Sequence, residues 1–219
     1  KNFMKIKKII NVLSQKMYGF EPTLIEKIIS SYEKDPFIIL ICCLLSLRSK
    51  DTVTIHVCKE LLEKATTPQE ILKLSTDELE KITYKIGFYK NKSKVLHKVS
   101  RELLNKYCGK VPKNAEDLLN LPGVGRKTAN LVLGMAYNIS AICVDIHVHR
   151  ISNRLGVVKT KTPEESEPAL QKIVPKKYWI ELNNLFVRWG QNICTPTSPK
   201  CSKCAIKKFC NRIGIKKSR

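Results

Sequence analysis

The sequence lacks long hydrophobic runs and has few acidic residues. Its longest apolar run, Phe37–Leu45, has nine residues, whereas a membrane-spanning helix needs about 20, so no membrane-embedded segment is expected. No signal-peptide pattern is visible, although the numbering begins at Lys1 without Met, which leaves an upstream segment open. Neither a low-complexity linker nor a repeat of fixed period is found. Hydrophobic residues make up 43% of the chain, which argues against disorder and predicts a packed core in one or two domains.

The shortage of acidic residues gives the chain a strong positive charge. The 40 Lys and Arg residues outnumber 19 Asp and Glu residues, and the formal net charge is +21. Such a field favours polyanionic partners, with nucleic acid first and an acidic membrane surface a distant second. We therefore expect a monomeric, intracellular and DNA-associated protein. Its compartment would be the cytoplasm and nucleoid of a prokaryote, or the nucleus or an organelle of a eukaryote.

The nine cysteines divide into a scattered group and a cluster. The scattered ones lie in apolar or helical contexts and are expected to be buried: Cys42, Cys43, Cys58, Cys108 and Cys143. The clustered ones have the spacing C-x6-C-x2-C-x5-C within seventeen residues: Cys194, Cys201, Cys204 and Cys210. Four thiolates on a short loop indicate one tetrahedral metal centre. The spacing alone leaves zinc and a [4Fe–4S] cluster both open.

The cysteine loop is also strongly basic, with no acidic residue from Cys194 to Arg219. A loop held at four points by a metal centre presents its lysines on a fixed surface, which suits phosphate contacts. The candidate DNA contacts in it are Lys200, Lys203 and Lys207, with Lys208 beside them. The alternative for these lysines is a solvated charged tail, which is what we expect of residues 216–219.

Elsewhere the pattern is helical, and no pair of strands with a hairpin turn is found. Asp35-Pro36 predicts the start of an apolar helix that ends at Leu47. Capping-box signatures open further helices at Thr67, Ser75 and Thr162. Two more helices are expected over residues 94–107 and 114–120. The predicted fold class is all-α, a bundle with short loops.

Residues 114–137, NAEDLLNLPGVGRKTANLVLGMAY, predict two helices joined by a tight turn. The chain reverses in a few residues at Pro122–Gly125, where a positive φ favours glycine. Backbone N–H groups at the two glycines and at the start of the second helix suit a bound phosphate. The predicted DNA contacts of this turn are Gly123, Val124, Gly125 and Arg126. The alternative is a plain helix–turn–helix corner.

LPGVGRKTAN, followed by VDIHVHR, resembles the helix-hairpin-helix and Gly/Pro-Asp segment of endonuclease III-type DNA glycosylases. The cysteine spacing resembles the [4Fe–4S] loop of the same family, and the resemblance runs from about Leu44 to Cys210. It implies a structural [4Fe–4S] cluster rather than zinc on the four clustered cysteines. It also implies two helical domains flanking a DNA-binding groove. A barrel-like domain with the helix-hairpin-helix would cover residues 29–139, and the cluster domain residues 1–28 plus 140–219.

The resemblance assigns the chemistry to two residues. The lysine of GRKTA is the family's nucleophile and is Lys127 here; its amine would attack C1′ of a damaged nucleotide and form a Schiff base. The Schiff base acidifies the 2′ proton and permits β-elimination of the 3′ phosphate. Asp145 matches the family's aspartate in VD-x-H and would stabilise positive charge at C1′ and assist proton transfers. Asp145 is also a candidate N-cap of the helix that runs to Leu155.

Removing a base from a duplex requires side chains that hold the helix open. By resemblance, Arg48 and Phe88 lie in the two segments that enter the DNA, with a surface arginine and a loop-anchoring aromatic as the alternatives. Two departures from the family pattern stand out. Leu47-Arg48 occupies a stretch that often carries Gln, which bears on the preferred opposite base. Ile146 replaces the usual Thr beside Asp145, which removes a hydroxyl next to the carboxylate.

The function implied is that of a bifunctional DNA glycosylase and AP lyase. Its substrate would be duplex DNA that contains oxidised pyrimidines or abasic sites. The nearest alternative is a monofunctional mismatch glycosylase of the same superfamily, which would remove adenine, thymine or uracil. A non-enzymatic DNA-binding module is the alternative from another class, and the pairing of Lys127 with Asp145 speaks against it.

Overall fold

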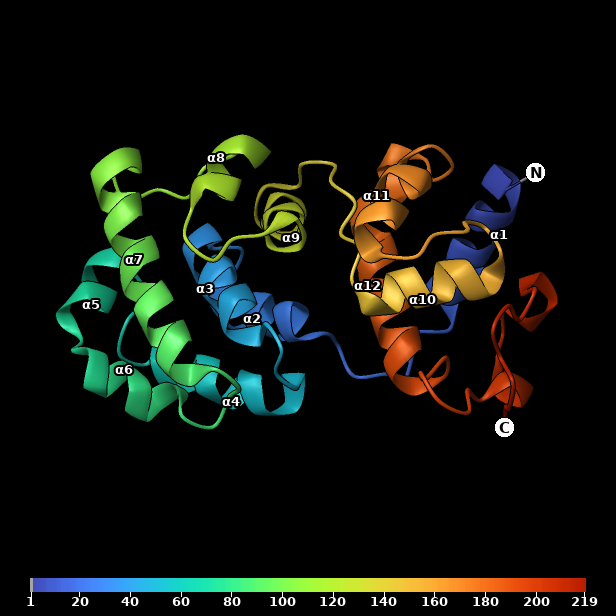
Figure 1. Cartoon of the computed structure of the whole chain (residues 1–219), viewed down its shortest axis with the longest axis horizontal. Coiled ribbons are helices and arrows are strands. Elements are labelled where there is room, and N and C mark those ends of the chain that lie inside the picture. Colours follow the sequence, from blue (N-terminus) through green and yellow to red (C-terminus); the bar gives the residue numbers. More distant parts are fainter. Residues whose placement is uncertain (1) are drawn as a thin grey trace. The chain divides into compact units, whose positions relative to one another are not determined.

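The computed structural model describes residues 2–219, and every regular element in that range is a helix, as predicted. Residue 1, which the expected cluster domain includes, lies outside the described residues. By their internal contacts the helices form two compact units, Pro22–Ile139 and Lys1–Glu21 with Ser140–Arg219 (Figure 1). Among the residues that the structure describes, no helix is both long and apolar enough to cross a bilayer.

The Pro22–Ile139 unit is built around one buried helix, α3. Its helices are α2 (Leu24–Tyr32), α3 (Pro36–Ser46), α4 (Asp51–Leu62), α5 (Pro68–Lys73), α6 (Thr76–Thr83), α7 (Tyr89–Tyr107), α8 (Ala115–Asn120) and α9 (Arg126–Tyr137). Every side chain from Phe37 to Leu45 is buried, and α3 contacts α2, α4, α7 and α9. The apolar run of the sequence is therefore the central core helix of this unit.

The break between the two units lies between residues 21 and 22, whereas the sequence-based domain boundary lies between residues 28 and 29. A boundary at residue 28 would cut α2. That helix buries Leu24, Ile25 and Ile28 and packs against α3 and α4, so it belongs with them. The assignment of two functional domains, and of a groove between them, stays a prediction.

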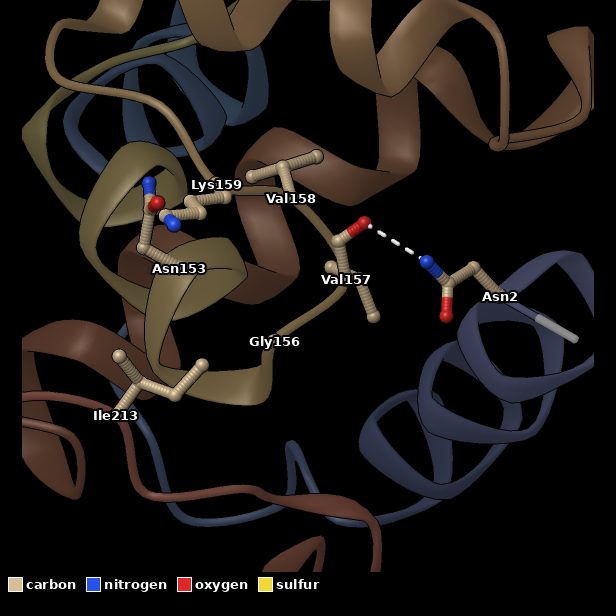
Figure 2. A pocket seen from close by; sticks show the side chains of 7 residues that line it. All are labelled: Asn2, Asn153, Gly156, Val157, Val158, Lys159 and Ile213. Atoms are coloured by element: carbon tan, nitrogen blue, oxygen red, sulfur yellow. Dashed lines mark hydrogen bonds between the residues drawn. The ribbon is translucent and has the colours of Figure 1, made fainter.

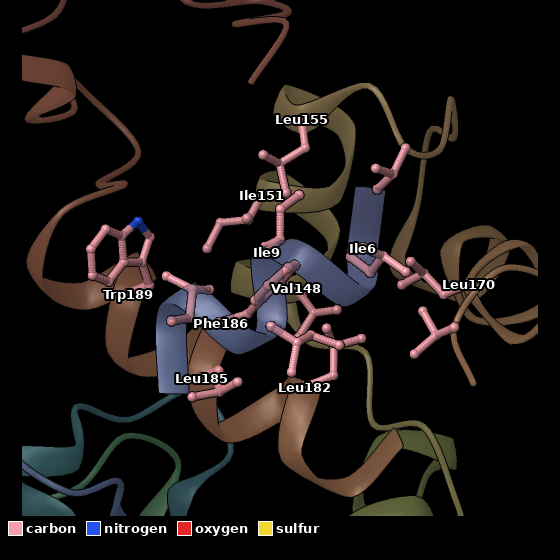
Figure 3. Close-up of a cluster of buried hydrophobic side chains, with 14 of the residues drawn as sticks. Ile6, Ile9, Val148, Ile151, Leu155, Leu170, Leu182, Leu185, Phe186 and Trp189 are labelled. Carbon is pink, nitrogen blue, oxygen red and sulfur yellow. The ribbon is translucent and has the colours of Figure 1, made fainter. Parts of the chain in front are cut away.

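The other unit joins the N-terminal helix to the last part of the chain in one core. Its helices are α1 (Asn2–Gln15), α10 (Ile146–Leu155), α11 (Pro163–Gln171) and α12 (Trp179–Asn192), with short 3₁₀ helices η1 (Lys176–Tyr178), η2 (Cys201–Lys203) and η3 (Lys207–Phe209). Side chains of all four α-helices meet in one hydrophobic cluster (Figure 3). Ile6 and Ile9 of α1 and Phe186 of α12 are fully buried there. The Trp189 ring packs edge-on against Phe20, with centroids 5.6 Å apart.

Side-chain caps start these helices close to where the sequence predicts. Asp35 accepts a hydrogen bond from Ile38 N (2.9 Å) at the start of α3, which ends one residue before the predicted Leu47. The capping boxes that begin at Thr67 and Ser75 both form in full. At Thr162 only half of the box forms, because the carboxylate of Glu165 accepts from the backbone of Lys161 instead.

Two expectations about α7 and its end are wrong. The helix begins at Tyr89 rather than near Lys94, because Phe88 at its N-cap adopts the left-handed conformation (φ 60°) and makes no side-chain cap that a sequence pattern would reveal. Cys108 is exposed, since it forms the left-handed C-cap of the same helix (φ 53°). The other scattered cysteines are buried as expected.

Candidate functional site

The predicted hairpin forms between α8 and α9. The backbone N–H of Leu121 donates to Leu118 O (3.2 Å) and that of Val124 to Leu121 O (3.1 Å), which closes the turn locally. Gly123 has a φ of 76°, and a Cβ atom there would lie 2.8 Å from Cγ1 of Val95. Both the backbone conformation and the close approach of α7 therefore require glycine at this position.

The outer side of the hairpin is open. A Cβ atom at Gly125, the N-cap of α9, would meet no atom within 4 Å, so glycine here leaves room for a molecule outside the chain. Gly123, Gly125 and Arg126 are exposed. Val124 differs, because its side chain is only 7% exposed and its N–H is used within the turn. We therefore assign Val124 to the core rather than to a DNA contact.

Lys127 is exposed at the second position of α9, directly after the open turn. The three residues that follow it are buried, so α9 turns into the core at once. Burial raises the pKa of the Cys43 thiol in α3 to about 12, and the positive charge of Lys127 partly opposes this rise. The lysine thus lies on the open hairpin while its charge acts on a buried residue of the central helix.

Asp145 is the N-cap of α10, as the sequence predicts. Its Oδ1 accepts hydrogen bonds from the backbone N–H groups of His147 and Val148, both at 2.9 Å. Both bonds use the same oxygen, so capping fixes the orientation of the carboxylate and does not engage Oδ2. Asp145 is half-buried, and of its two neighbours in the chain Val144 is buried whereas Ile146 is 66% exposed.

The two histidines of VDIHVHR have partners within their own unit. His147 Nδ1 lies 3.0 Å from Nη2 of Arg150. His149 Nδ1 lies 2.7 Å from the hydroxyl of Ser166 in α11. The first contact lies within α10 and the second joins α10 to α11, and we give neither histidine a role in acid–base chemistry.

Arg48 and Phe88, predicted on sequence grounds to enter the DNA, lie together in the Pro22–Ile139 unit. The Arg48 guanidinium carbon lies 5.3 Å from the centroid of the Phe88 ring, which is a cation–π distance. Both residues have left-handed backbone conformations, with φ of 54° and 60°, and the Phe88 side chain is 63% exposed. An exposed aromatic side chain stacked on an arginine is suited to contact bases.

The four clustered cysteines are half-buried in one loop, and their thiols act on one another electrostatically. Burial raises the pKa of Cys204, an effect that the N–H groups of Ile206 and Trp189 oppose and that Cys194 and Cys210 reinforce. Burial also raises the pKa of Cys210. Within residues 2–219, no three His, Cys, Asp or Glu side chains are grouped so as to hold a single metal ion.

Two arginines of α10 that sequence reasoning missed hold the base of this loop. Arg150 donates through Nε (3.1 Å) and Nη2 (3.0 Å) to the carbonyl oxygen of Cys194. Arg154, only 9% exposed, donates to Thr195 O (2.7 Å), to Pro196 O (2.6 Å) and to Sγ of Cys194 (3.3 Å). The available signal was the spacing of two basic residues one helical turn apart, on a helix that begins at Asp145.

The basic part of the loop is only partly solvated. Lys203, Lys207 and Lys208 are exposed, while Lys200 is half-buried. The prediction that residues 216–219 form a solvated tail is wrong for Arg219. Its backbone N–H donates to Pro199 O (2.8 Å), and its carbonyl oxygen accepts from Ser202 N (2.9 Å). These bonds fix the last residue of the chain to the cysteine loop.

A pocket of about 500 Å³ lies beyond the end of α10 (Figure 2). It is lined by Asn2, Asn153, Gly156, Val157, Val158, Lys159 and Ile213. Asn2 donates to Val157 O across it, at 3.1 Å, and none of the predicted site residues lines it. The candidate chemistry therefore does not take place in this pocket.

Comparisons with known proteins agree on one family. Residues 41–176 match the family described as HhH-GPD superfamily base excision DNA repair protein. Endonuclease III of Thermotoga maritima is 47% identical over 178 residues, which cover 81% of this chain and 84% of the relative.

Two solved structures have the same fold. A trapped endonuclease III–DNA covalent intermediate, an estranged-adenine complex, is 32% identical with a TM-score of 0.84, and the match covers 96% of each chain. A thermostable thymine-DNA glycosylase is 25% identical with a TM-score of 0.85, and the match covers 95% of this chain and 96% of that one. The chain therefore belongs to the HhH-GPD superfamily of base excision DNA repair proteins and is a DNA glycosylase and AP lyase of the endonuclease III type.

Proposed function

We propose that the chain removes oxidised pyrimidines from duplex DNA, with Lys127 as the nucleophile. The amine attacks C1′ of the damaged nucleotide, the C1′–N bond to the base breaks, and an imine to the opened sugar remains. Loss of a 2′ proton then expels the 3′ phosphate. The observation that carries this proposal is an exposed lysine in the first turn of α9, directly after an open glycine turn.

The hairpin would bind the DNA backbone next to the reacting sugar. The N-terminus of α9 offers backbone N–H groups and a partial positive charge, and the exposed Gly125 and Arg126 allow a phosphate to approach. Lys203 and Lys207 would add phosphate contacts, and Lys200 a weaker one. The partner is a duplex with a damaged base or an abasic site, and the protein acts on it as a monomer wherever the cell keeps its DNA.

Asp145 would act on the charge that develops at C1′. Because Oδ1 is held by two backbone N–H groups, the carboxylate cannot rotate freely, and Oδ2 is not used by the helix cap. A fixed negative charge stabilises an oxocarbenium-like centre more effectively than a mobile one, since no reorganisation is needed during the reaction. The same carboxylate can accept a proton from the attacking amine.

The cysteine loop fits a [4Fe–4S] cluster held by Cys194, Cys201, Cys204 and Cys210. The four half-buried thiols lie in one loop and interact electrostatically, and donors already face two of them: the Arg154 guanidinium at Cys194 and the Arg212 N–H at Cys210 (3.4 Å). The buried indole N–H of Trp189 acts on the Cys204 thiol and lowers its pKa, so it favours the thiolate form that a cluster ligand requires. A bound cluster would cross-link the loop and present its lysines to DNA.

A monofunctional thymine glycosylase is the second candidate. The thermostable thymine-DNA glycosylase matches this fold as well as the endonuclease III intermediate does, so the fold alone does not select the lesion. Lys127 favours the bifunctional enzyme, because a monofunctional reaction uses water as the nucleophile and needs no amine.

Replacing the proposed nucleophile tests the covalent step. Lys127→Ala should abolish borohydride trapping of the protein on an abasic-site duplex and slow strand cleavage by about 10³-fold or more. Binding to the uncleaved duplex, measured by mobility shift, should survive, because only one of 40 basic residues is lost. Lys98→Ala, at an exposed position of α7, is the control and should trap normally. Persistent trapping by Lys127→Ala would assign the imine to another residue.

Two substitutions of Asp145 separate capping from chemistry. Asn also caps helices, so Asp145→Asn should leave the free energy of unfolding within about 0.5 kcal/mol, whereas Asp145→Ala should lower it by about 1 kcal/mol. Both should slow base excision by about 10²-fold or more, since both remove the carboxylate charge. Denaturant melts and single-turnover excision give the two quantities. If Asp145→Asn excised the base at the rate of the unsubstituted protein, Asp145 would act only as a helix cap.

A panel of duplexes distinguishes the two glycosylase classes. We expect strand cleavage without added alkali at thymine glycol and at an abasic site, and none at uracil or at a G:T mismatch. Lys127→Ala provides the background for each duplex. Release of thymine from G:T that leaves an intact, alkali-sensitive site would instead support the monofunctional candidate.

The cluster assignment predicts colour and metal content. The purified protein should be yellow-brown and contain four iron atoms per chain, as expected of a [4Fe–4S] centre with Cys₄ ligands. Cys204→Ser should reduce the iron content sharply, while Cys108→Ser, at an exposed cysteine outside the loop, should not. A colourless protein with one zinc per chain would refute the assignment.

A further inference from the structure

Ser49 joins the two segments that carry Arg48 and Phe88. Its hydroxyl oxygen accepts hydrogen bonds from the backbone N–H of Gly87 (3.2 Å) and from Nζ of Lys92 (2.9 Å). The segments approach so closely that a Cβ atom at Gly87 would lie 3.1 Å from the carbonyl oxygen of Arg48. The two segments therefore form one structural unit although they lie about forty residues apart in the sequence.

Lys92 connects this unit to the central helix. Its side chain is only 7% exposed, and Nζ donates to Leu45 O (2.7 Å), a carbonyl at the C-terminal end of α3 that has no partner within its own helix. An ammonium group is favourable there, because the last turn of a helix carries a partial negative charge. Burial lowers the pKa of Lys92 to about 8, so the ammonium form still predominates at neutral pH.

The conformations held by this network are unfavourable in isolation. Arg48 and Phe88 both have positive φ, at 54° and 60°, which residues with a Cβ rarely adopt. Such conformations persist only where surrounding contacts impose them. The backbone N–H of Lys92 donates to Phe88 O (3.0 Å), so one residue contacts both sides of the pair through its side chain and its main chain.

We propose that Lys92 is a positioning residue for strand opening: by bridging Leu45 and Ser49 it holds Arg48 and Phe88 as one preformed wedge. The wedge fills the space that a nucleotide leaves when it is extruded, and a preformed wedge avoids the entropy cost of ordering both segments on the DNA. This inference rests on the proposed entry of Arg48 and Phe88 into the duplex. It predicts that substitution of Lys92 slows the cleavage of duplex DNA but not the cleavage of single-stranded DNA.

The test compares one abasic site in duplex and in single-stranded DNA, which makes it independent of the lesion class. Lys92→Met and Ser49→Ala should slow single-turnover cleavage in the duplex by about 10- to 100-fold, as expected when a contact group is misplaced. Cleavage in the single strand should stay within about twofold of the unsubstituted protein, because the hairpin and Lys127 are unchanged. Lys94→Met, an exposed lysine two residues along α7, is the matched control and should behave as the unsubstituted protein on both DNAs.

A fluorescent base reports the wedge directly. With 2-aminopurine opposite the abasic site, the unsubstituted protein should increase its fluorescence on binding as the base leaves the stack, and Lys92→Met and Ser49→Ala should give a smaller increase. Ser49→Ala leaves the bond from Lys92 to Leu45 in place, so it tests the bridge even if Lys92→Met is unstable.

The inference is overturned if Lys92→Met and Ser49→Ala cleave the duplex as fast as Lys94→Met does. It is also overturned if they slow cleavage of the duplex and of the single strand equally, because that result indicates a general loss of structure. Arg48→Ala and Phe88→Ala test the underlying assignment separately. If both leave duplex cleavage unchanged, the wedge itself is refuted. If they slow it while Lys92→Met does not, only the positioning role is refuted.

Discussion

A helix buried on every side must satisfy its last carbonyl groups without water, and this constraint organises the Pro22–Ile139 unit. The hydroxyl of Ser46 donates to Cys43 O (2.8 Å) and the ammonium of Lys92 to Leu45 O (2.7 Å) at the end of α3. The chain leaves the core at this point, and the segment with Arg48 follows. On another side α3 packs against α9, which begins with Arg126 and Lys127. One buried helix thus supports both the proposed wedge and the proposed nucleophile.

The second unit uses α10 in a comparable way. Its first turn is fixed by the carboxylate of Asp145, and its later turns carry Arg150 and Arg154, which hold the backbone of the cysteine loop. Ten residues of helix span about 15 Å at 1.5 Å per residue, so a short rigid element connects the proposed catalytic carboxylate with the proposed cluster. Both arginines donate to carbonyl oxygens of the loop, and Arg154 also donates to the sulfur of Cys194. The arginines therefore constrain the loop through its main chain.

The sequence identified the features that depend on local patterns. Lys127 at a helix start, Asp145 as an N-cap and the full capping boxes at Thr67 and Ser75 follow from residue types at short spacings. The errors concern contacts between distant segments. No local pattern shows that Phe88 takes a left-handed conformation beside Arg48, that Val124 is buried, or that the last residue bonds to the cysteine loop. Arg150 and Arg154 were missed because basic residues on a helix are usually solvated, and only the fold reveals acceptors beside them.

Arg154 holds both ends of the cysteine loop. Its guanidinium binds the carbonyl oxygens of Thr195 and Pro196, while its own carbonyl oxygen accepts from Ile213 N (3.2 Å) and from the thiol of Cys210 (3.4 Å). The segment from Thr195 to Ile213 is thus a closed loop, because both of its ends are bonded to Arg154. The entropy of such a loop depends only weakly on its length, with about 0.6 kcal/mol for each doubling. Extra residues at the exposed tip therefore cost little entropy, whereas loss of the Arg154 guanidinium would release Thr195 and Pro196 and leave Arg150 to hold that end at Cys194.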